Sequence, residues 1–137
     1  IFDRGPSPQR CNFRVGPEMA EECEIAFWKS MDELVPIFER EKLPLHLEAH
    51  PDDFIEDNDL AVDMVQAIGS AYVKYLYCGP HTFHLGRDLG HMIRYAAPVL
   101  AHVHVADSFD HKAGWRYVVN PAGSTARVHQ HLNIGEE

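Results

Sequence analysis

Three side chains that can bind a metal ion lie at or just after the ends of short apolar segments of this sequence. Glu48 and His104 end two of these segments, and His81 follows a third. If the segments are parallel strands of a barrel, their carboxyl ends meet at the edge where active sites are built. A carboxylate together with imidazoles suits Zn, Mn, Fe or Co better than Ca or Mg. The pattern therefore predicts one divalent metal ion bound by Glu48, His81 and His104.

The three segments have the pattern of strands. Residues 45–48, Leu-His-Leu-Glu, alternate apolar and polar side chains with the period of two that is typical of a strand. Pro44 suits the start of this strand, and Pro51 stops it. Residues 73–78 predict a strongly apolar strand, and residues 100–106 predict a third strand.

Helical periodicity predicts three helices around these strands. The first extends from about Glu18 to Arg40, the second from about Asp59 to Ile68, and the third from about Asp88 to Ala97. Gly69 is suited to end the second helix. The first helix has one apolar face, made of Cys23, Phe27, Ser30, Leu34, Ile37 and Phe38. Residues 81–86 and residues 108–137 have no clear period and are predicted to be loops.

Alternating helices and strands imply parallel strands joined by right-handed crossovers, an α/β fold. Three or four strands cannot close a TIM barrel, which needs eight. The 137 residues, taken as a single domain, therefore predict either an open sheet or about half of a larger barrel.

Composition excludes several classes of protein. The formal charge of −9, from 12 basic and 21 acidic residues, argues against nucleic acid as a partner. No apolar run approaches the roughly 18 residues of a membrane span, so no membrane partner is expected. Three cysteines without CxxC spacing argue against a disulfide framework and fit a cytoplasmic protein. The ten histidines stand out, because most lie near predicted strand ends or in loops.

Several of these histidines accompany the three predicted ligands. His102 and His104 lie two apart in one strand and so face the same side. His102, deeper in the strand, is interpreted as a core histidine or as support for a ligand, and Asp107 could hydrogen-bond a ligating imidazole. His84 could contact substrate or support His81. His131 could hold substrate oxygens or lie in a solvated loop.

Four motifs, in order along the chain, resemble the sugar-phosphate isomerase/epimerase superfamily, the xylose isomerase-like TIM barrels. They are Glu-Ala-His-Pro at 48–51, His-Thr-Phe-His at 81–84, His-Val-Ala-Asp at 104–107, and His-x-x-Ile-Gly at 131–135. They correspond to the family's fifth, sixth and seventh strand ends and the loop that follows. Ile1 and Phe2 would end the fourth strand. The resemblance thus implies a barrel from strand 4 or 5 to strand 7.

The chain departs from the family pattern at two positions. His81 stands where the family has an Asp ligand, which favours Mn, Zn or Co over Mg. The family's last ligand, a Glu on the eighth strand, is expected beyond Glu137. The resemblance thus implies a partial barrel that exposes apolar edges, and either a homo-oligomer or completion by further barrel segments.

The resemblance implies a metal-dependent isomerase or epimerase of carbohydrate metabolism in the full-length form. Its substrate would be a sugar, sugar phosphate or cyclitol, and the reaction would transfer a proton through an enediolate. Glu48 would be both ligand and general base, and His50 and His84 would hold substrate hydroxyls. The alternatives are an endonuclease IV-like phosphodiester hydrolase, which the charge of −9 opposes, and a non-catalytic barrel fragment used for assembly.

Overall fold

A computed structural model describes residues 17–50, 54–82, 88–107, 118–119, 128–129 and 131–135 of the chain. The elements in order are α1 (Pro17–Glu41), β1 (Leu45–Glu48), α2 (Asn58–Ile68), β2 (Val73–Cys78), α3 (Gly79–Thr82), α4 (Leu89–Ala96), β3 (Leu100–His104), β4 (Val118–Val119) and β5 (Val128–His129). The predicted strand end at Ile1 and Phe2, residues 83–86 of the predicted loop and the side chain of His84 lie outside the described residues.

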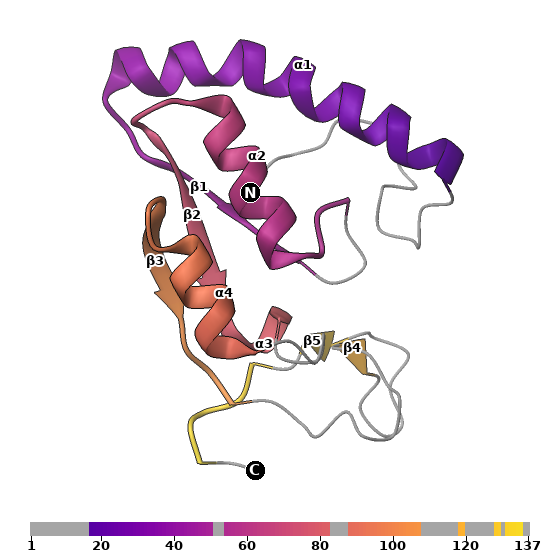
Figure 1. The fold of residues 1–137 in the computed structure, drawn as a ribbon, viewed down its shortest axis with the longest axis vertical. Helices are drawn as coiled ribbons and strands as arrows, with labels where there is room; N and C mark the ends of the chain where they lie inside the picture. The colour runs from indigo at the N-terminus through magenta and orange to yellow at the C-terminus, as the bar shows by residue number, and fades with distance from the viewer. Residues whose placement is uncertain are drawn as a thin grey trace.

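A parallel sheet with the order β1-β2-β3 is the centre of the fold (Figure 1). The three strands begin at the predicted residues, although β3 ends at His104 rather than Ala106. Glu48 is level with Leu76 across the first pair, and Cys78 is level with His104 across the second. Because the strands are parallel, their carboxyl ends lie at one edge of the sheet. The prediction of parallel strands is confirmed.

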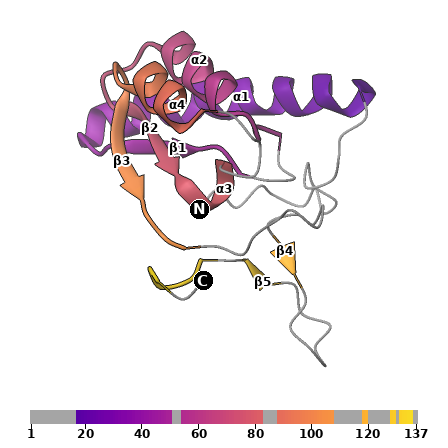
Figure 2. The ribbon, with the colours of Figure 1, turned by 60° about the horizontal axis from the view of Figure 1, so that its bottom comes forward.

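The helices α1, α2 and α4 lie on one side of this sheet (Figure 2). Alternate strand residues pack against them, because successive side chains of a strand point to opposite faces. The buried core therefore combines residues of both layers, among them Met31, Leu45, Leu47, Val62, Val65, Val73, Tyr75, Tyr77 and Met92. The remaining strand residues, including His46, Glu48 and Cys78, are outside this core cluster. The sheet thus separates an apolar helix-covered face from a face that carries the polar strand ends.

Local signals set the bounds of α2. The Asp57 side chain accepts hydrogen bonds from the backbone N–H groups of Asp59 and Leu60, which caps the first turn. Gly69 ends the helix with a φ of 68°, a left-handed conformation that glycine adopts without steric cost. Asp88 caps α4 in the same way, by accepting from the N–H groups of Gly90 and His91. These caps explain why the sequence predicts both helices to within one residue.

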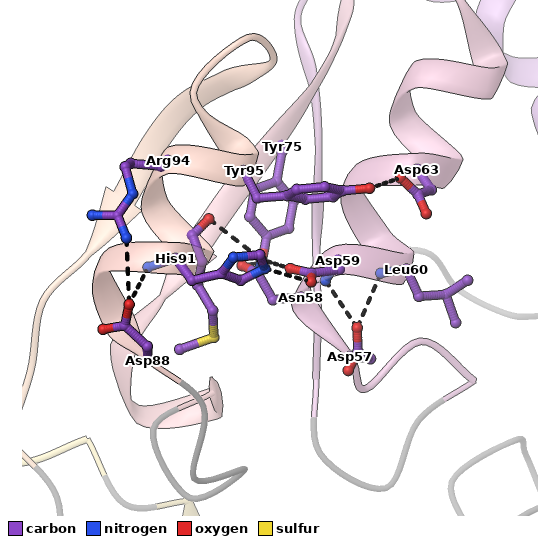
Figure 3. Close-up of polar contacts among 11 residues, drawn as sticks. Asp57, Asn58, Asp59, Leu60, Asp63, Tyr75, Asp88, His91, Arg94 and Tyr95 are labelled. Carbon is purple, nitrogen blue, oxygen red and sulfur yellow. Dashed lines mark hydrogen bonds and ion pairs between the residues drawn. The ribbon is translucent and has the colours of Figure 1, made fainter.

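Hydrogen bonds and an ion pair between polar side chains join α2, α4 and β2 (Figure 3). Asn58 is fully buried, and its side-chain oxygen accepts a 2.9 Å hydrogen bond from the Tyr75 hydroxyl. Its amide nitrogen lies 2.8 Å from Asp59 Oδ1 and 3.4 Å from the carbonyl oxygen of Met92. Asp59 in turn contacts His91 Nε2 at 2.8 Å. Asn58 therefore connects two helices to the strand that leads into Cys78 and His81.

Some sequence predictions of local structure are wrong. His81 and Thr82, the described part of the loop predicted at 81–86, belong to the short helix α3, and Thr82 Oγ1 donates a 2.9 Å hydrogen bond to the carbonyl of Cys78 at the end of β2. Residues 108–137 are not loop throughout, because β4 and β5 pair antiparallel. Ser30 and Ile37, both expected on the buried face of α1, are exposed, Ile37 by 43%. The core uses Met31 of α1 instead, with Val35 packed against it.

Cysteine chemistry also differs from the expectation. Cys23 is disulfide-bonded. Cys78 is a free buried thiol. The cysteine pattern argues against a disulfide framework, and the bond at Cys23 departs from that expectation. Across the described ranges, none of the helices combines the length and the apolar character needed to cross a bilayer.

We expect Asn58→Ala to lower the free energy of unfolding by about 2 kcal/mol. The substitution leaves the buried Tyr75 hydroxyl without its acceptor, and a buried unsatisfied polar group costs about 1–3 kcal/mol. Urea unfolding followed by circular dichroism measures the change. The control is Tyr95→Phe, which removes the exposed 2.7 Å contact to Asp63 and should cost less than about 1 kcal/mol. Equal losses in the two variants would contradict a structural role for the buried network.

Candidate metal centre

The structure brings the three predicted ligands together at the carboxyl edge of the sheet. Glu48 ends β1, His104 ends β3, and His81 lies in α3 directly after β2. Oε1 of Glu48 is 2.7 Å from Nδ1 of His81 and 3.7 Å from Nδ1 of His104. The carboxylate thus lies within ion-pair distance of both imidazoles. Their role as ligands stays a prediction.

The protein backbone holds the His81 imidazole in place. His81 is buried, and its Nδ1 lies 3.2 Å from the carbonyl oxygen of Ala49. In the tautomer with the proton on Nδ1, the ring donates to this carbonyl, and Nε2 is left as a lone-pair donor. Ligating histidines commonly use a backbone carbonyl in this way. The His50 ring packs edge-on against His81, with 4.5 Å between ring centroids.

Glu48 carries an unsatisfied buried oxygen. Its Oε1 is inaccessible to solvent, and among the described residues no hydrogen bond of good geometry reaches it, although His81 Nδ1 is 2.7 Å away. That contact therefore has the distance of an ion pair without the geometry of a hydrogen bond. A buried carboxylate oxygen normally has a hydrogen-bond donor or a cation as its partner. The chemistry and position of this oxygen fit a bound cation.

The surroundings of Glu48 favour its charged form. Burial works to raise the pKa of Glu48, but His81 together with Cys78 and His104 outweighs burial and lowers the pKa below its usual value. Glu48 is therefore ionised at neutral pH, which is the form that binds a cation or accepts a proton.

Cys78 and His131 extend the site beyond the predicted ligands. Sγ of Cys78 is 3.4 Å from Nε2 of His131, and the His131 ring is 5.0 Å from the His81 ring between centroids. The sequence indicates that Cys78 is buried, which is confirmed, but not that it belongs to this site. Alternation along β2 gives the available signal, because it turns Cys78 away from the side chains of Tyr75 and Tyr77 that enter the core.

Two sets of donors in the described part of the chain are compact enough to hold a metal ion. One set is Cys78, His81 and His131, and the other is Glu48, Cys78 and His104. Within each set the ligand atoms lie within 4.8 Å of one another. The predicted trio is thus divided between the two sets, and Cys78 belongs to both.

The two residues expected to support a ligand take different positions. His102 is exposed rather than part of the core, because β3 lies at the edge of the described sheet. Its ring stacks on His46 and lies edge-on to His104, with 5.1 Å between the latter centroids. The Asp107 carboxylate accepts a hydrogen bond from the Gly135 N–H. The expected bond from Asp107 to a ligating imidazole stays a prediction.

Asp107 also fixes the segment that carries His131. Its N–H donates to the Leu132 carbonyl at 3.0 Å, and the Leu132 N–H donates back at 2.9 Å. This isolated antiparallel bridge ties residues 131–135 to the end of β3. The bridge explains how a residue far along the chain reaches the end of β2.

Comparison with known proteins identifies the family. A family model described as xylose isomerase-like TIM barrel matches residues 8–137, and the chain belongs to this family. The three-stranded parallel sheet with its helices is accordingly part of an α/β barrel. A search of curated proteins found no match. A search of solved structures likewise found none.

We expect the metal-free protein to lose stability as the pH rises from about 9 to about 12. Burial, with Glu48 adding to it, raises the pKa of the Cys78 thiol from 9.0 to about 12. In this window the folded thiol keeps its proton and the unfolded thiol loses it, so rising pH favours unfolding. The free energy of unfolding, measured at about pH 8 and about pH 10.5, should fall less in Cys78→Ser than in the wild type. Identical falls would contradict a raised thiol pKa.

Proposed function

We propose that this protein is a metal-dependent isomerase or epimerase acting on a sugar, sugar phosphate or cyclitol. The observation that carries the proposal is the Glu48 carboxylate within ion-pair distance of two imidazoles at the carboxyl ends of parallel strands. In barrels of this kind that edge is where chemistry occurs. Membership of the xylose isomerase-like family supports this choice of reaction.

Glu48, His81 and His104 are the residues proposed to hold the divalent cation. The unsatisfied Oε1 of Glu48 and the lone pairs of the two imidazoles supply oxygen and nitrogen donors. This donor set favours Mn, Zn or Co over Mg, which prefers oxygen ligands and water. When bound, the cation supplies Lewis-acid stabilisation of negative charge that develops on a substrate oxygen.

Glu48 is also the proposed proton acceptor. An ionised carboxylate can take a proton from the carbon next to a substrate carbonyl and return it to that carbon or its neighbour. Its side chain is 27% exposed, so the carboxylate is partly accessible while Oε1 is buried. His50, half-buried against His81, is the residue proposed to donate hydrogen bonds to substrate hydroxyls. Proton transfer by Glu48 and orientation by His50 together account for isomerisation or epimerisation.

The charge of the chain supports a small-molecule substrate. A phosphodiester hydrolase acting on DNA must attract a polyanion, which a formal charge of −9 repels. Isomerisation of a sugar needs no such attraction, and the acid–base group it requires is present in Glu48. The isomerase is therefore favoured over the endonuclease IV-like alternative.

The open edge of the sheet supports further barrel segments as partners. β3 lies at an edge of the described sheet, and Val103 on it is 43% exposed. Exposed apolar strand edges are normally paired or covered. We propose that additional strands, from the full-length chain or a second copy, complete the barrel here.

We expect Glu48→Gln to retain part of the metal affinity of the full-length protein and to lose nearly all turnover. The amide keeps an oxygen donor but has no basic site for the proton. Incorporation of deuterium from heavy water into a panel of ketoses and ketose phosphates measures the proton transfer directly. Glu41→Gln is the matched control, because Glu41 is exposed and contacts Arg40 in α1. Near-normal exchange in Glu48→Gln would exclude Glu48 as the base.

A second experiment separates the isomerase from the endonuclease alternative. We expect no salt-dependent binding of the metal-loaded protein to duplex DNA, because the net charge of −9 disfavours association with phosphates. Fluorescence anisotropy of a labelled duplex at low and at physiological salt measures it. Binding that weakens steeply with added salt would contradict the proposed substrate class.

A further inference from the structure

Cys78 is the residue of the candidate metal centre that neither the family pattern nor the proposed mechanism uses. It is a buried free thiol at the end of β2, level with His104 across the sheet. It belongs to both donor sets, Cys78–His81–His131 and Glu48–Cys78–His104. A cation bound by either set would therefore lie close to the Cys78 sulfur.

We propose that Cys78 is a thiolate ligand of the metal ion, with His131 as a further nitrogen ligand, and that the centre selects Zn²⁺ or Co²⁺. This inference deepens the proposed function and rests on the metal site assigned there. Soft thiolate donors favour Zn²⁺, whereas Mg²⁺ and Mn²⁺ suit carboxylates, carbonyls and water. Glu48 and the imidazoles favour Mn, Zn or Co over Mg. A sulfur ligand would remove Mn from this group and leave Zn²⁺ or Co²⁺.

The distance between Cys78 and His131 fits a shared ion. A tetrahedral zinc ion binds sulfur at about 2.3 Å and nitrogen at about 2.0 Å, so two such ligand atoms lie roughly 3.5 Å apart. Sγ of Cys78 and Nε2 of His131 are 3.4 Å apart. The same distance also suits a hydrogen bond between thiol and imidazole, which is the competing explanation and gives a different experimental result.

The surrounding structure holds these donors in position. The Asp107–Leu132 bridge fixes the residue next to His131, and the Ala49 carbonyl orients His81. Thr82 Oγ1 bonds the Cys78 carbonyl, which fixes the turn between Cys78 and His81. Preorganised ligands of this kind are typical of metal centres. His131 is exposed, and its Nε2 lies 3.4 Å from Cys78 Sγ, so the ligand role proposed for it stands beside the sequence prediction of a substrate contact.

Binding of the cation by Cys78 requires loss of the thiol proton. The Cys78 thiol releases its proton to solvent as the sulfur binds the cation, without any change in oxidation state. The cation offsets the negative charge of Glu48 beside the sulfur.

The test is a cobalt titration of the chelator-treated, full-length protein. A thiolate ligand gives Co²⁺ an intense charge-transfer band in the near ultraviolet, which nitrogen and oxygen ligands do not give. We expect this band in the wild type and its loss in Cys78→Ser.

The zinc affinity of Cys78→Ser and of His131→Asn, measured by competition with a chromogenic chelator, should fall at least about tenfold. The matched control is His91→Asn, which removes an imidazole on α4 and should leave spectrum and affinity unchanged.

A second measurement needs no variant. X-ray absorption of the zinc-loaded wild type should show a sulfur scatterer at about 2.3 Å. Cobalt binding without the band, or zinc without a sulfur scatterer, would overturn thiolate ligation in favour of a thiol–imidazole hydrogen bond, and the isomerase proposal would stand. A band that depends on Cys78, with undiminished proton exchange in Glu48→Gln, would support thiolate ligation and refute the proposed function. Failure of the folded wild type to bind either ion would refute the metal site and the inference together.

Discussion

The site depends on the parallel register of three strands. Because β1, β2 and β3 run the same way, the residues that end them lie at one edge, and Glu48 comes within ion-pair distance of two imidazoles. Burying a carboxylate costs free energy unless a donor or a cation compensates it. The strand register therefore buries Oε1 of Glu48 without a hydrogen bond of good geometry among the described residues, and a bound cation would compensate its charge.

The helix-covered face makes that arrangement rigid. The core residues of β1 and β2 alternate with the polar ones, so burial of Leu47 and Tyr75 forces Glu48 and Cys78 out of the helix-covered core. A shift of one residue in either strand would bury the polar side chains instead. Asn58 reinforces the position of β2 through its bond to the Tyr75 hydroxyl.

Residue patterns predicted the helices and strands well where interactions between residues close in the sequence determine them. Alternation indicated residues 45–48 as a strand, and a strongly apolar run indicated residues 73–78. The helix starts predicted at about Asp59 and Asp88 lie within one residue of the starts of α2 and α4. Prediction failed where contacts between distant segments decide the structure. No local period indicates the β4–β5 pair, and the exposure of Ile37 depends on how α1 meets the sheet. The short helix α3 has only four residues, too few for periodicity to reveal.

The sequence by itself determined the order of elements and the chemical types at the strand ends, because periodicity and capping act over a few residues. It thereby indicated Glu48, His81 and His104 as one group. Only the tertiary structure decided that Cys78 and His131 lie among them. The strand register set the place of Cys78, and the Asp107–Leu132 bridge brought His131 across a long stretch of chain. Such proximity results from packing between segments, which no local pattern encodes.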